Sequence, residues 1–160
     1  MNIKTADFGI FVIFAALYAA GTMGLPELNI LLYQIKPGEM PTAMVGIFGP
    51  PAVIGLVLGQ WIASTTSSIG AIDMLSPVVS LAGLLIILCF RRLSVLFGSL
   101  VYVLLTSIWM TYLLGATTGE SSIALLQSTL LGQSISVMIG YVFYQITRRT
   151  IFAKSRITKH

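Results

Sequence analysis

Long apolar stretches with charges confined to their ends dominate this chain. Of its 160 residues, 56% are hydrophobic and 9% are charged, whereas about 25% of a typical soluble domain is charged. Such a chain cannot cover a soluble core with polar side chains, so lipid must be its solvent. Because one spanning helix needs about 20 apolar residues, the length allows five or six spans within a single integral membrane domain that covers residues 1–160.

The break within the second apolar stretch decides the number of helices. Gly49, Pro50 and Pro51 interrupt this stretch, and consecutive prolines remove backbone donors and clash with the preceding turn. The stretch therefore predicts two helices instead of one. We expect an all-α bundle of six transmembrane helices at approximately 8–25, 40–49, 51–67, 73–90, 93–116 and 121–147, followed by a basic tail at 148–160.

The distribution of charge tests this count independently, because basic residues mark the cytoplasmic ends of membrane spans. Six helices place all but one of the basic residues on the same side: Lys4, Arg91, Arg92, Arg148, Arg149, Lys154, Arg156 and Lys159. The other side then carries Glu27, Glu39, Asp73 and Glu120, and only Asp7 and Lys36 depart from the pattern. Five helices would separate Lys4 from Arg91. We therefore expect a multi-pass protein of the cell membrane with both termini in the cytoplasm.

The remaining composition argues against several other classes of protein. We attribute the net charge of +4 to membrane orientation and anionic lipid headgroups, so nucleic acid is not an expected partner. The single cysteine, Cys89, predicts a buried thiol and no multi-cysteine metal site. Residues 1 to about 20 also allow a cleaved signal peptide, although Asp7 is unusual in the n-region of such a segment. The lone histidine is His160, and catalytic and ATP-binding motifs are absent, so we expect neither an enzyme nor a cofactor.

The residues before and within the second helix favour a binding site on the outer face. This helix is too short to cross about 30 Å of hydrocarbon, so residues 25–37 must cover the remaining depth, beside protein or water. Glu39 lies near the positive end of the helix, where its carboxylate can stay ionised and accept two parallel donors. For Glu39, and for Asp73 at the start of the fourth helix, the alternative is helix capping. Lys36 either neutralises Glu39 or contacts a ligand.

Polar and aromatic residues in the outer half of the bundle are further candidates for the same cavity. They are Tyr33, Gln34, Gln60, Trp61, Trp109, Tyr112 and Gln127. Aromatic rings can stack on a flat ligand and glutamine amides can bind its edge. Aromatic residues also favour the membrane interface without any ligand, so both interpretations remain open.

Small residues four positions apart occur on two of the expected helices. Ala15 and Ala19 lie on the first helix, and Gly55 and Gly59 lie on the third. Such spacing lets two helices approach closely. For the alanines, packing inside the bundle and docking to another subunit are equally compatible with the pattern.

From Tyr33 to Leu85 the chain resembles the queuosine-precursor transporter (QueT) family, whose members are substrate-binding S components of energy-coupling factor (ECF) transporters. The resemblance begins with the run of residues 33–39, Tyr-Gln-Ile-Lys-Pro-Gly-Glu. It continues through the proline-marked turn, the two glycines of the third helix, and Asp73. Lys36 stands where the family pattern has arginine, and Gly38 stands where serine or alanine is usual.

The resemblance implies a six-helix S component that captures a 7-deazaguanine, such as queuine, preQ0 or preQ1, on its outer face. Its partners would be a membrane T subunit and two ATPase subunits, and the family's docking motif falls on Ala15 and Ala19. Glu39 would accept the two adjacent N–H donors of such a cargo in a fork, and Asp73 would pair with an aminomethyl cation. The alternatives are an S component for another vitamin-like heterocycle and a non-transporting membrane scaffold or assembly protein.

Overall fold

The computed structural model describes residues 5–24, 35–67, 69–119 and 122–157, and all regular structure within these ranges is helical. The elements are α1 (Thr5–Met23), the 3₁₀ helix η1 (Pro37–Met44), α3 (Val45–Phe48), α4 (Pro50–Ser64), the 3₁₀ helix η2 (Ala71–Leu75), α5 (Ser76–Phe90), α6 (Val95–Thr118) and α7 (Ser122–Ile157). Counting η1 with α3 and η2 with α5, these eight elements make six helical segments. The predicted all-α fold and helix count are confirmed.

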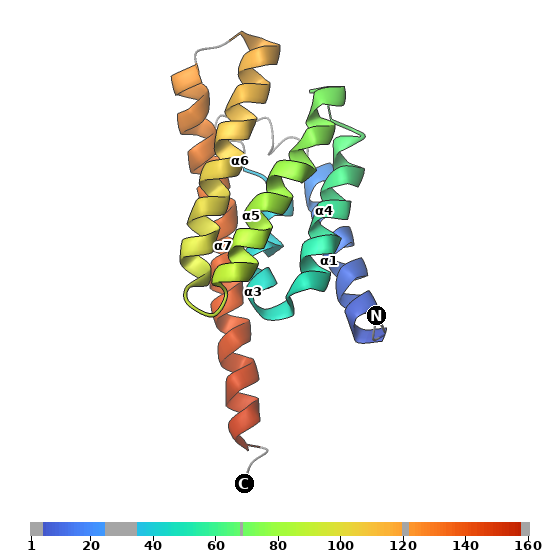
Figure 1. Cartoon of the computed structure of the whole chain (residues 1–160), viewed down its shortest axis with the longest axis vertical. Coiled ribbons are helices and arrows are strands. Elements are labelled where there is room, and N and C mark those ends of the chain that lie inside the picture. The colour runs from blue at the N-terminus through green and yellow to red at the C-terminus, as the bar shows by residue number, and fades with distance from the viewer. Residues whose placement is uncertain (1–4, 25–34, 68, 120–121, 158–160) are drawn as a thin grey trace.

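Successive segments run in alternating directions, which gathers the basic residues of the described chain, apart from Lys36, at the same end. The start of α1, the connection between α5 and α6, and the last turns of α7 all lie at the lower end of Figure 1. Arg91 and Arg92 lie in that connection, and Arg148 and Arg149 lie in the last turns of α7. We call this end the basic end. Asp73 belongs to η2 at the opposite end, so the helical arrangement reproduces the separation of charge seen in the sequence.

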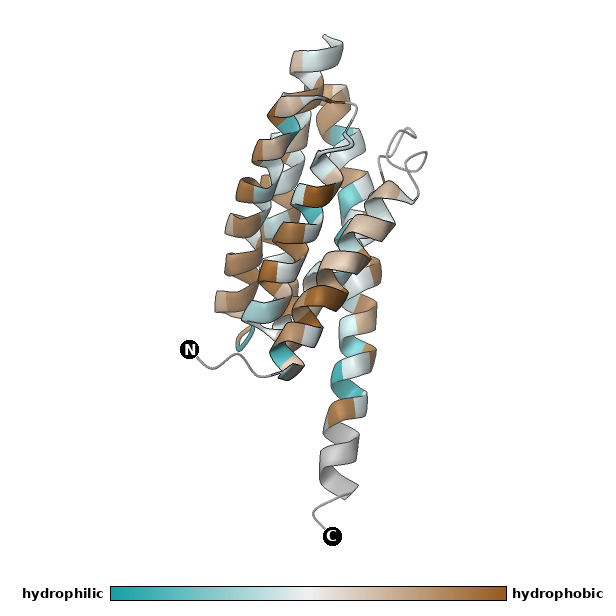
Figure 2. Ribbon diagram, turned by 90° about the vertical axis from the view of Figure 1, so that its right-hand side faces the viewer, coloured by the Kyte–Doolittle hydropathy of each residue, from teal (hydrophilic) through white to brown (hydrophobic). Residues whose placement is uncertain are grey.

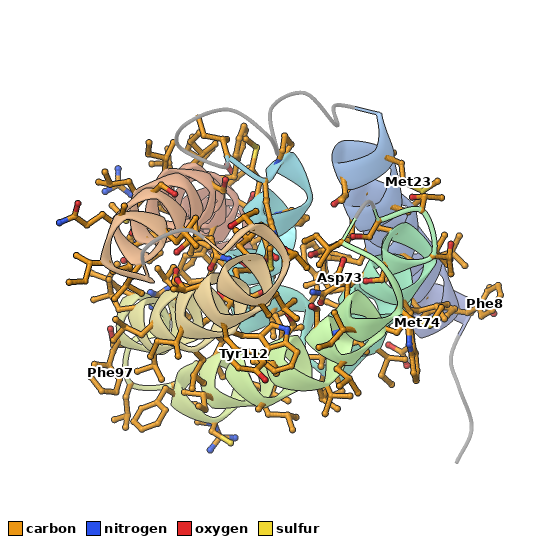
Figure 3. The ribbon with its side chains drawn as sticks, turned by 90° about the horizontal axis from the view of Figure 1, so that it is seen from above. Phe8, Met23, Asp73, Met74, Phe97 and Tyr112 are labelled. Carbon is orange, nitrogen blue, oxygen red and sulfur yellow. The ribbon has the colours of Figure 1, made fainter. Side chains whose placement is uncertain are left out.

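Much of the surface is apolar, as expected for helices in lipid. Among the described residues, four helices are long and apolar enough to cross a membrane: Thr5–Met23, Ala71–Phe90, Val95–Thr118 and Ile123–Ile151. Figure 2 shows hydrophobic residues along these helices and polar residues gathered in the lower part of α7. Phe8 and Phe97 are exposed and point away from the bundle (Figure 3). Exposed apolar surface of this extent marks a contact with membrane. Cys89 of α5 is also exposed, so the prediction of a buried thiol is wrong, because a free cysteine behaves as a small apolar side chain that can face lipid as well as a core.

Gly49 separates the two short helices that the proline pair predicts. Its φ of 71° and ψ of −148° end α3, and Pro50 and Pro51 occupy the first turn of α4. Glycine adopts a positive φ without the strain that a side chain would cause, and the first turn of a helix tolerates proline. The eight residues before α3 form η1, although most 3₁₀ runs end within three or four residues.

The helices α1 and α4 pack with their backbones in close contact. A Cβ atom on Gly59 would collide with the carbonyl oxygen of Ala15, and a Cβ atom on Gly55 would lie 2.5 Å from the carbonyl oxygen of Phe11. Ala15 is buried in this interface and Ala19 is half-buried. The structure therefore gives Ala15 a role in internal packing, and docking of another subunit through Ala15 and Ala19 stays a prediction.

Hydrogen bonds between side chains join α6 to α7. The Oε1 atom of Gln133 accepts hydrogen bonds from the hydroxyls of Thr106 and Ser107, the latter at 3.2 Å. The hydroxyls of Thr111 and Thr129 lie 3.1 Å apart. All of these residues except the half-buried Thr111 are buried, so a polar seam runs through the interface.

Candidate functional site

The carboxylate of Glu39 is buried within the bundle and bonded to two tyrosines. Its side chain is 2% exposed. Tyr18 of α1 donates its hydroxyl to Oε1 at 2.8 Å, and Tyr102 of α6 donates its hydroxyl to Oε2. A carboxylate removed from water is costly unless it accepts hydrogen bonds, and the two tyrosine hydroxyls supply them. The Glu39 carboxylate is therefore held between α1 and α6.

The backbone around Glu39 is fixed by contacts with its neighbours. The N–H of Lys36 donates to Ser136 Oγ of α7 at 3.1 Å, and Thr42 Oγ1 donates to the carbonyl oxygen of Glu39 at 2.8 Å. Gly38 lies against α1, where an added Cβ would lie 2.8 Å from the carbonyl oxygen of Tyr18. This close approach gives a physical reason for glycine at a position where the family pattern has serine or alanine.

The two tyrosines leave part of the carboxylate's accepting capacity unused. Each carboxylate oxygen has two lone-pair directions, and Tyr18 and Tyr102 take one direction on each oxygen. One acceptor position therefore remains on either oxygen, which suits two parallel N–H donors in a fork. The side chain of Glu39 bonds to tyrosines, so the structure does not support the helix-capping alternative for this residue.

Lys36 lies in the electrostatic field of both acidic candidates. Its ammonium group interacts with Glu39 and, more weakly, with Asp73. No ion pair joins it to either carboxylate within the described part of the chain. Lys36 therefore lies within electrostatic range of both carboxylates.

Asp73 takes part in a short chain of hydrogen bonds that links η2 to α6. Ser76 donates its hydroxyl to Asp73 Oδ1 at 2.5 Å, and the indole N–H of Trp109 donates to Ser76 Oγ at 2.8 Å. In the view from above, Asp73 lies nearer the middle of the molecule than Phe8 and Phe97 do (Figure 3). Asp73 accepts a hydrogen bond from a side chain here, whereas a helix cap would accept from a backbone N–H.

The structure separates the remaining predicted residues into an inner and an outer group. Gln60 of α4 is buried and Trp109 is half-buried. Trp61 is 49% exposed, Tyr112 is 62% exposed, and Gln127 is also exposed. The fold therefore does not bring these last three side chains into the interior with Glu39. Tyr33 and Gln34 lie outside the described residues.

Three buried polar residues of this region escaped the sequence analysis: Tyr18, Tyr102 and Gln133. A weak signal for the tyrosines exists, because both lie well inside apolar helices, whereas tyrosines that anchor a helix at the interface lie at its ends. A tyrosine at membrane depth needs a partner for its hydroxyl. In the described residues, no group of three or more His, Cys, Asp or Glu side chains is placed to hold a metal ion.

A sequence model described as "QueT transporter" matches residues 10–149. The chain belongs to the QueT transporter family. The match includes Tyr18, Glu39, Asp73 and Tyr102, and it extends well beyond the segment from Tyr33 to Leu85 on which the resemblance rested. No curated protein and no solved structure matches the chain.

Membership of a QueT transporter family gives the buried cluster a functional meaning. The chain is a membrane protein involved in transport. Ionisable residues at membrane depth in such proteins are rare and mark the path of a substrate or an ion. Glu39, with its two hydroxyl donors, is a buried ionisable residue of this QueT member.

Proposed function

We propose that this chain is the substrate-binding S component of an ECF-type ABC importer. It captures a queuosine precursor, a 7-deazaguanine such as queuine, preQ0 or preQ1. The observation that carries this proposal is the buried Glu39 carboxylate, held by Tyr18 and Tyr102 in a chain of the QueT transporter family. Because the sequence has no ATP-binding motif, we assign ATP hydrolysis to two ATPase subunits that act with a membrane T subunit.

The chemistry of Glu39 suits the edge of a deazaguanine. The ring N–H and the exocyclic amino group of this base present two adjacent donors. One carboxylate can accept both, and such charge-assisted bonds are about twice as strong as neutral ones. Tyr18 and Tyr102 hold the carboxylate plane without occupying the second acceptor position on either oxygen. The site is therefore prepared for a fork of two donors.

The neighbouring candidates have supporting roles in this proposal. Asp73 pairs with the aminomethyl cation of a cargo such as preQ1, and Lys36 balances the charge of Glu39. Trp109, half-buried and bonded to Ser76, offers a ring for stacking, and the buried Gln60 offers an amide. Tyr33, Gln34, Trp61, Tyr112 and Gln127 remain candidates for the entrance.

The orientation follows from the two ends of the bundle. We assign the basic end to the cytoplasm because arginine and lysine accumulate on that side of cell membranes. The end that carries Asp73 then faces outward, both termini are cytoplasmic, and the cargo enters from the outside of the cell membrane.

Replacement of Glu39 tests the proposal. The protein purified in detergent is titrated with preQ1, preQ0, queuine, guanine and riboflavin, with tryptophan fluorescence as the readout. Glu39→Gln replaces half of the acceptor with a donor, so the Kd for the deazaguanines should rise at least tenfold, or about 1.4 kcal/mol. Asp7→Asn at the basic end is the matched control and should leave the Kd unchanged.

Each other outcome of this titration has a clear meaning. An unchanged Kd in the Glu39→Gln variant removes Glu39 from the site. Tight binding of riboflavin alone transfers the chain to another vitamin-like cargo. Binding of none of the five compounds favours a membrane scaffold, and in that case copurification from native membranes should yield no ATPase subunits.

A further inference from the structure

A shallow groove, partly open to the surface, lies between α6 and α7. It is lined by Leu96, Ser99, Leu100, Val103, Ser134, Val137, Met138 and Tyr141. Leu100 and Met138 are exposed at its rim, so the groove opens on the outer surface of the helices. None of the lining residues is among the candidates for the cargo, and the groove needs a different occupant.

The residues of α7 that line the groove lie on a helix face that also carries two arginines. Residues 134, 138 and 141 follow the helical spacing of one face, and the same face continues through Gln145 to Arg148 and Arg149. Arg148 lies seven residues beyond Tyr141, which is two helical turns or about 10 Å. Both arginines are exposed at the basic end. An apolar groove thus ends beside two cations on one helix.

The residues of α6 that line the groove begin near the basic end of the bundle. Leu96 is the first of them, two residues after Ser94, whose hydroxyl accepts a hydrogen bond from the N–H of Phe97 at 3.2 Å and caps the helix. Arg92 lies two residues before this cap and is exposed. Arg148 and Arg149 continue the groove's face on α7, and such cations favour an occupant with an anionic head and an apolar tail.

Ser99 gives a second, independent indication of a ligand. It is 2% exposed and lines the groove, yet its Oγ atom has no hydrogen-bond partner in the described part of the chain. A buried hydroxyl without a partner costs about 1–3 kcal/mol. Other hydroxyls of α6, such as Thr106 and Thr111, bond to a carbonyl oxygen of the preceding turn. Ser99 has a donor left for an acceptor that enters the groove.

We propose that the groove between α6 and α7 binds an anionic phospholipid. One acyl chain lies along Leu100, Val137 and Met138, and the phosphate lies beside Arg148 and Arg149. The hydroxyl of Ser99 donates to an ester carbonyl oxygen of the lipid. Basic residues beside grooves of membrane helices often bind anionic headgroups. In this protein the groove would fix the position of the lipid's acyl chain.

Native mass spectrometry of the full-length protein in detergent tests this proposal. The protein is titrated with phosphatidylglycerol and, separately, with phosphatidylcholine of the same acyl chains. We expect at least one phosphatidylglycerol molecule to bind about tenfold more tightly than phosphatidylcholine, because basic residues near the membrane surface attract anionic lipid. Equal binding of the two lipids would overturn the proposal.

Two matched pairs of variants assign the bound lipid to the groove. Leu100→Trp fills the groove, whereas Leu104→Trp changes a residue of α6 that is equally exposed, at 52%, but does not line it. Arg148→Gln combined with Arg149→Gln removes the charge at the groove, whereas Arg91→Gln removes charge beside Gly49. The first variant of each pair should lose the preference for phosphatidylglycerol and the second should keep it.

The same spectra report the alternatives. Equal lipid binding in Leu100→Trp and Leu104→Trp would place the lipid elsewhere on the surface. A dimer that dissociates in Leu100→Trp would make the occupant a second copy of the chain and would also refute the lipid site. Binding of preQ1 should be the same in all of these variants, so failure here leaves the proposal for Glu39 untouched.

Discussion

Two helix interfaces of this protein use opposite chemistry. The contact between α1 and α4 depends on small residues, with Gly55 and Gly59 against the backbone of α1. The contact between α6 and α7 depends on hydrogen bonds that converge on Gln133. Lipid is as apolar as leucine, so membrane helices associate through close packing or through polar bonds. Here the two solutions occur side by side in one chain.

Glu39 receives one hydrogen bond from each of these two kinds of interface. Tyr18 reaches it from the closely packed interface, and Tyr102 reaches it from α6, next to the polar seam. The hydroxyl of Thr106, one turn beyond Tyr102, lies within hydrogen-bonding distance of both the carbonyl oxygen of Tyr102 and Oε1 of Gln133, which share its one proton. The α1–α4 interface thus positions one donor and the α6–α7 interface positions the other, and the carboxylate of Glu39 links α1 to α6.

Disturbing the closely packed interface should have the largest effect. In Gly59→Ala the new methyl group meets the backbone oxygen of Ala15, which cannot rotate away as a side chain would. We expect a loss of about 3 kcal/mol in unfolding free energy, at the upper range for overpacking. Thermal unfolding in detergent measures this loss.

Gly9→Ala is the matched control for that experiment. A Cβ atom on Gly9 would meet nothing within 4 Å, and alanine favours a helix over glycine by about 1 kcal/mol. Gly9→Ala should therefore leave stability unchanged or raise it. If the two variants unfold at the same temperature, backbone approach is not what holds α1 to α4.

Removing either tyrosine hydroxyl should have an intermediate effect, measured on binding. Tyr18→Phe and Tyr102→Phe each take one donor from Glu39, and a hydrogen bond to a charged group contributes about 1.5–3 kcal/mol. We expect the Kd for preQ1 to rise about tenfold in each variant. Tyr144→Phe, at a buried tyrosine that is not one of the two donors to Glu39, should bind normally. A change in only one of the first two variants would show that one interface alone positions the carboxylate.

Breaking the polar seam should have the smallest effect. Gln133→Leu removes the acceptor for Thr106 and Ser107, but interhelical hydrogen bonds in membranes contribute only about 0.6 kcal/mol on average. We expect unfolding in detergent to shift by about this amount. Gln127→Leu, at an exposed residue of the same helix, should shift it less. A loss in Gln133→Leu as large as in Gly59→Ala would reverse the ranking of the two interfaces.

The fold was predictable from the sequence because a few residues restrict it strongly. Gly49, Pro50 and Pro51 cannot continue a helix, and the basic residues restrict the number of crossings. Glu39 was predictable as a site residue because an ionisable group at membrane depth is costly. These arguments need no knowledge of how the helices pack.

The partners of Glu39 could not be predicted because they depend on helix rotation. Tyr18 and Tyr102 are 21 and 63 residues away from it in the chain. Gln127 and Gln133 lie on the same helix and look alike in the sequence, yet the first is exposed and the second is buried. Only the packed bundle shows which face of an almost uniformly apolar helix turns inward.

The eight residues of η1 extend further than they would in an α-helix. A 3₁₀ helix rises about 2.0 Å per residue and an α-helix about 1.5 Å, so η1 spans roughly 16 Å instead of 12 Å. Tighter winding thus lengthens a short segment by about 4 Å without an added residue. Rewinding into α geometry would draw the ends of η1 together by the same amount.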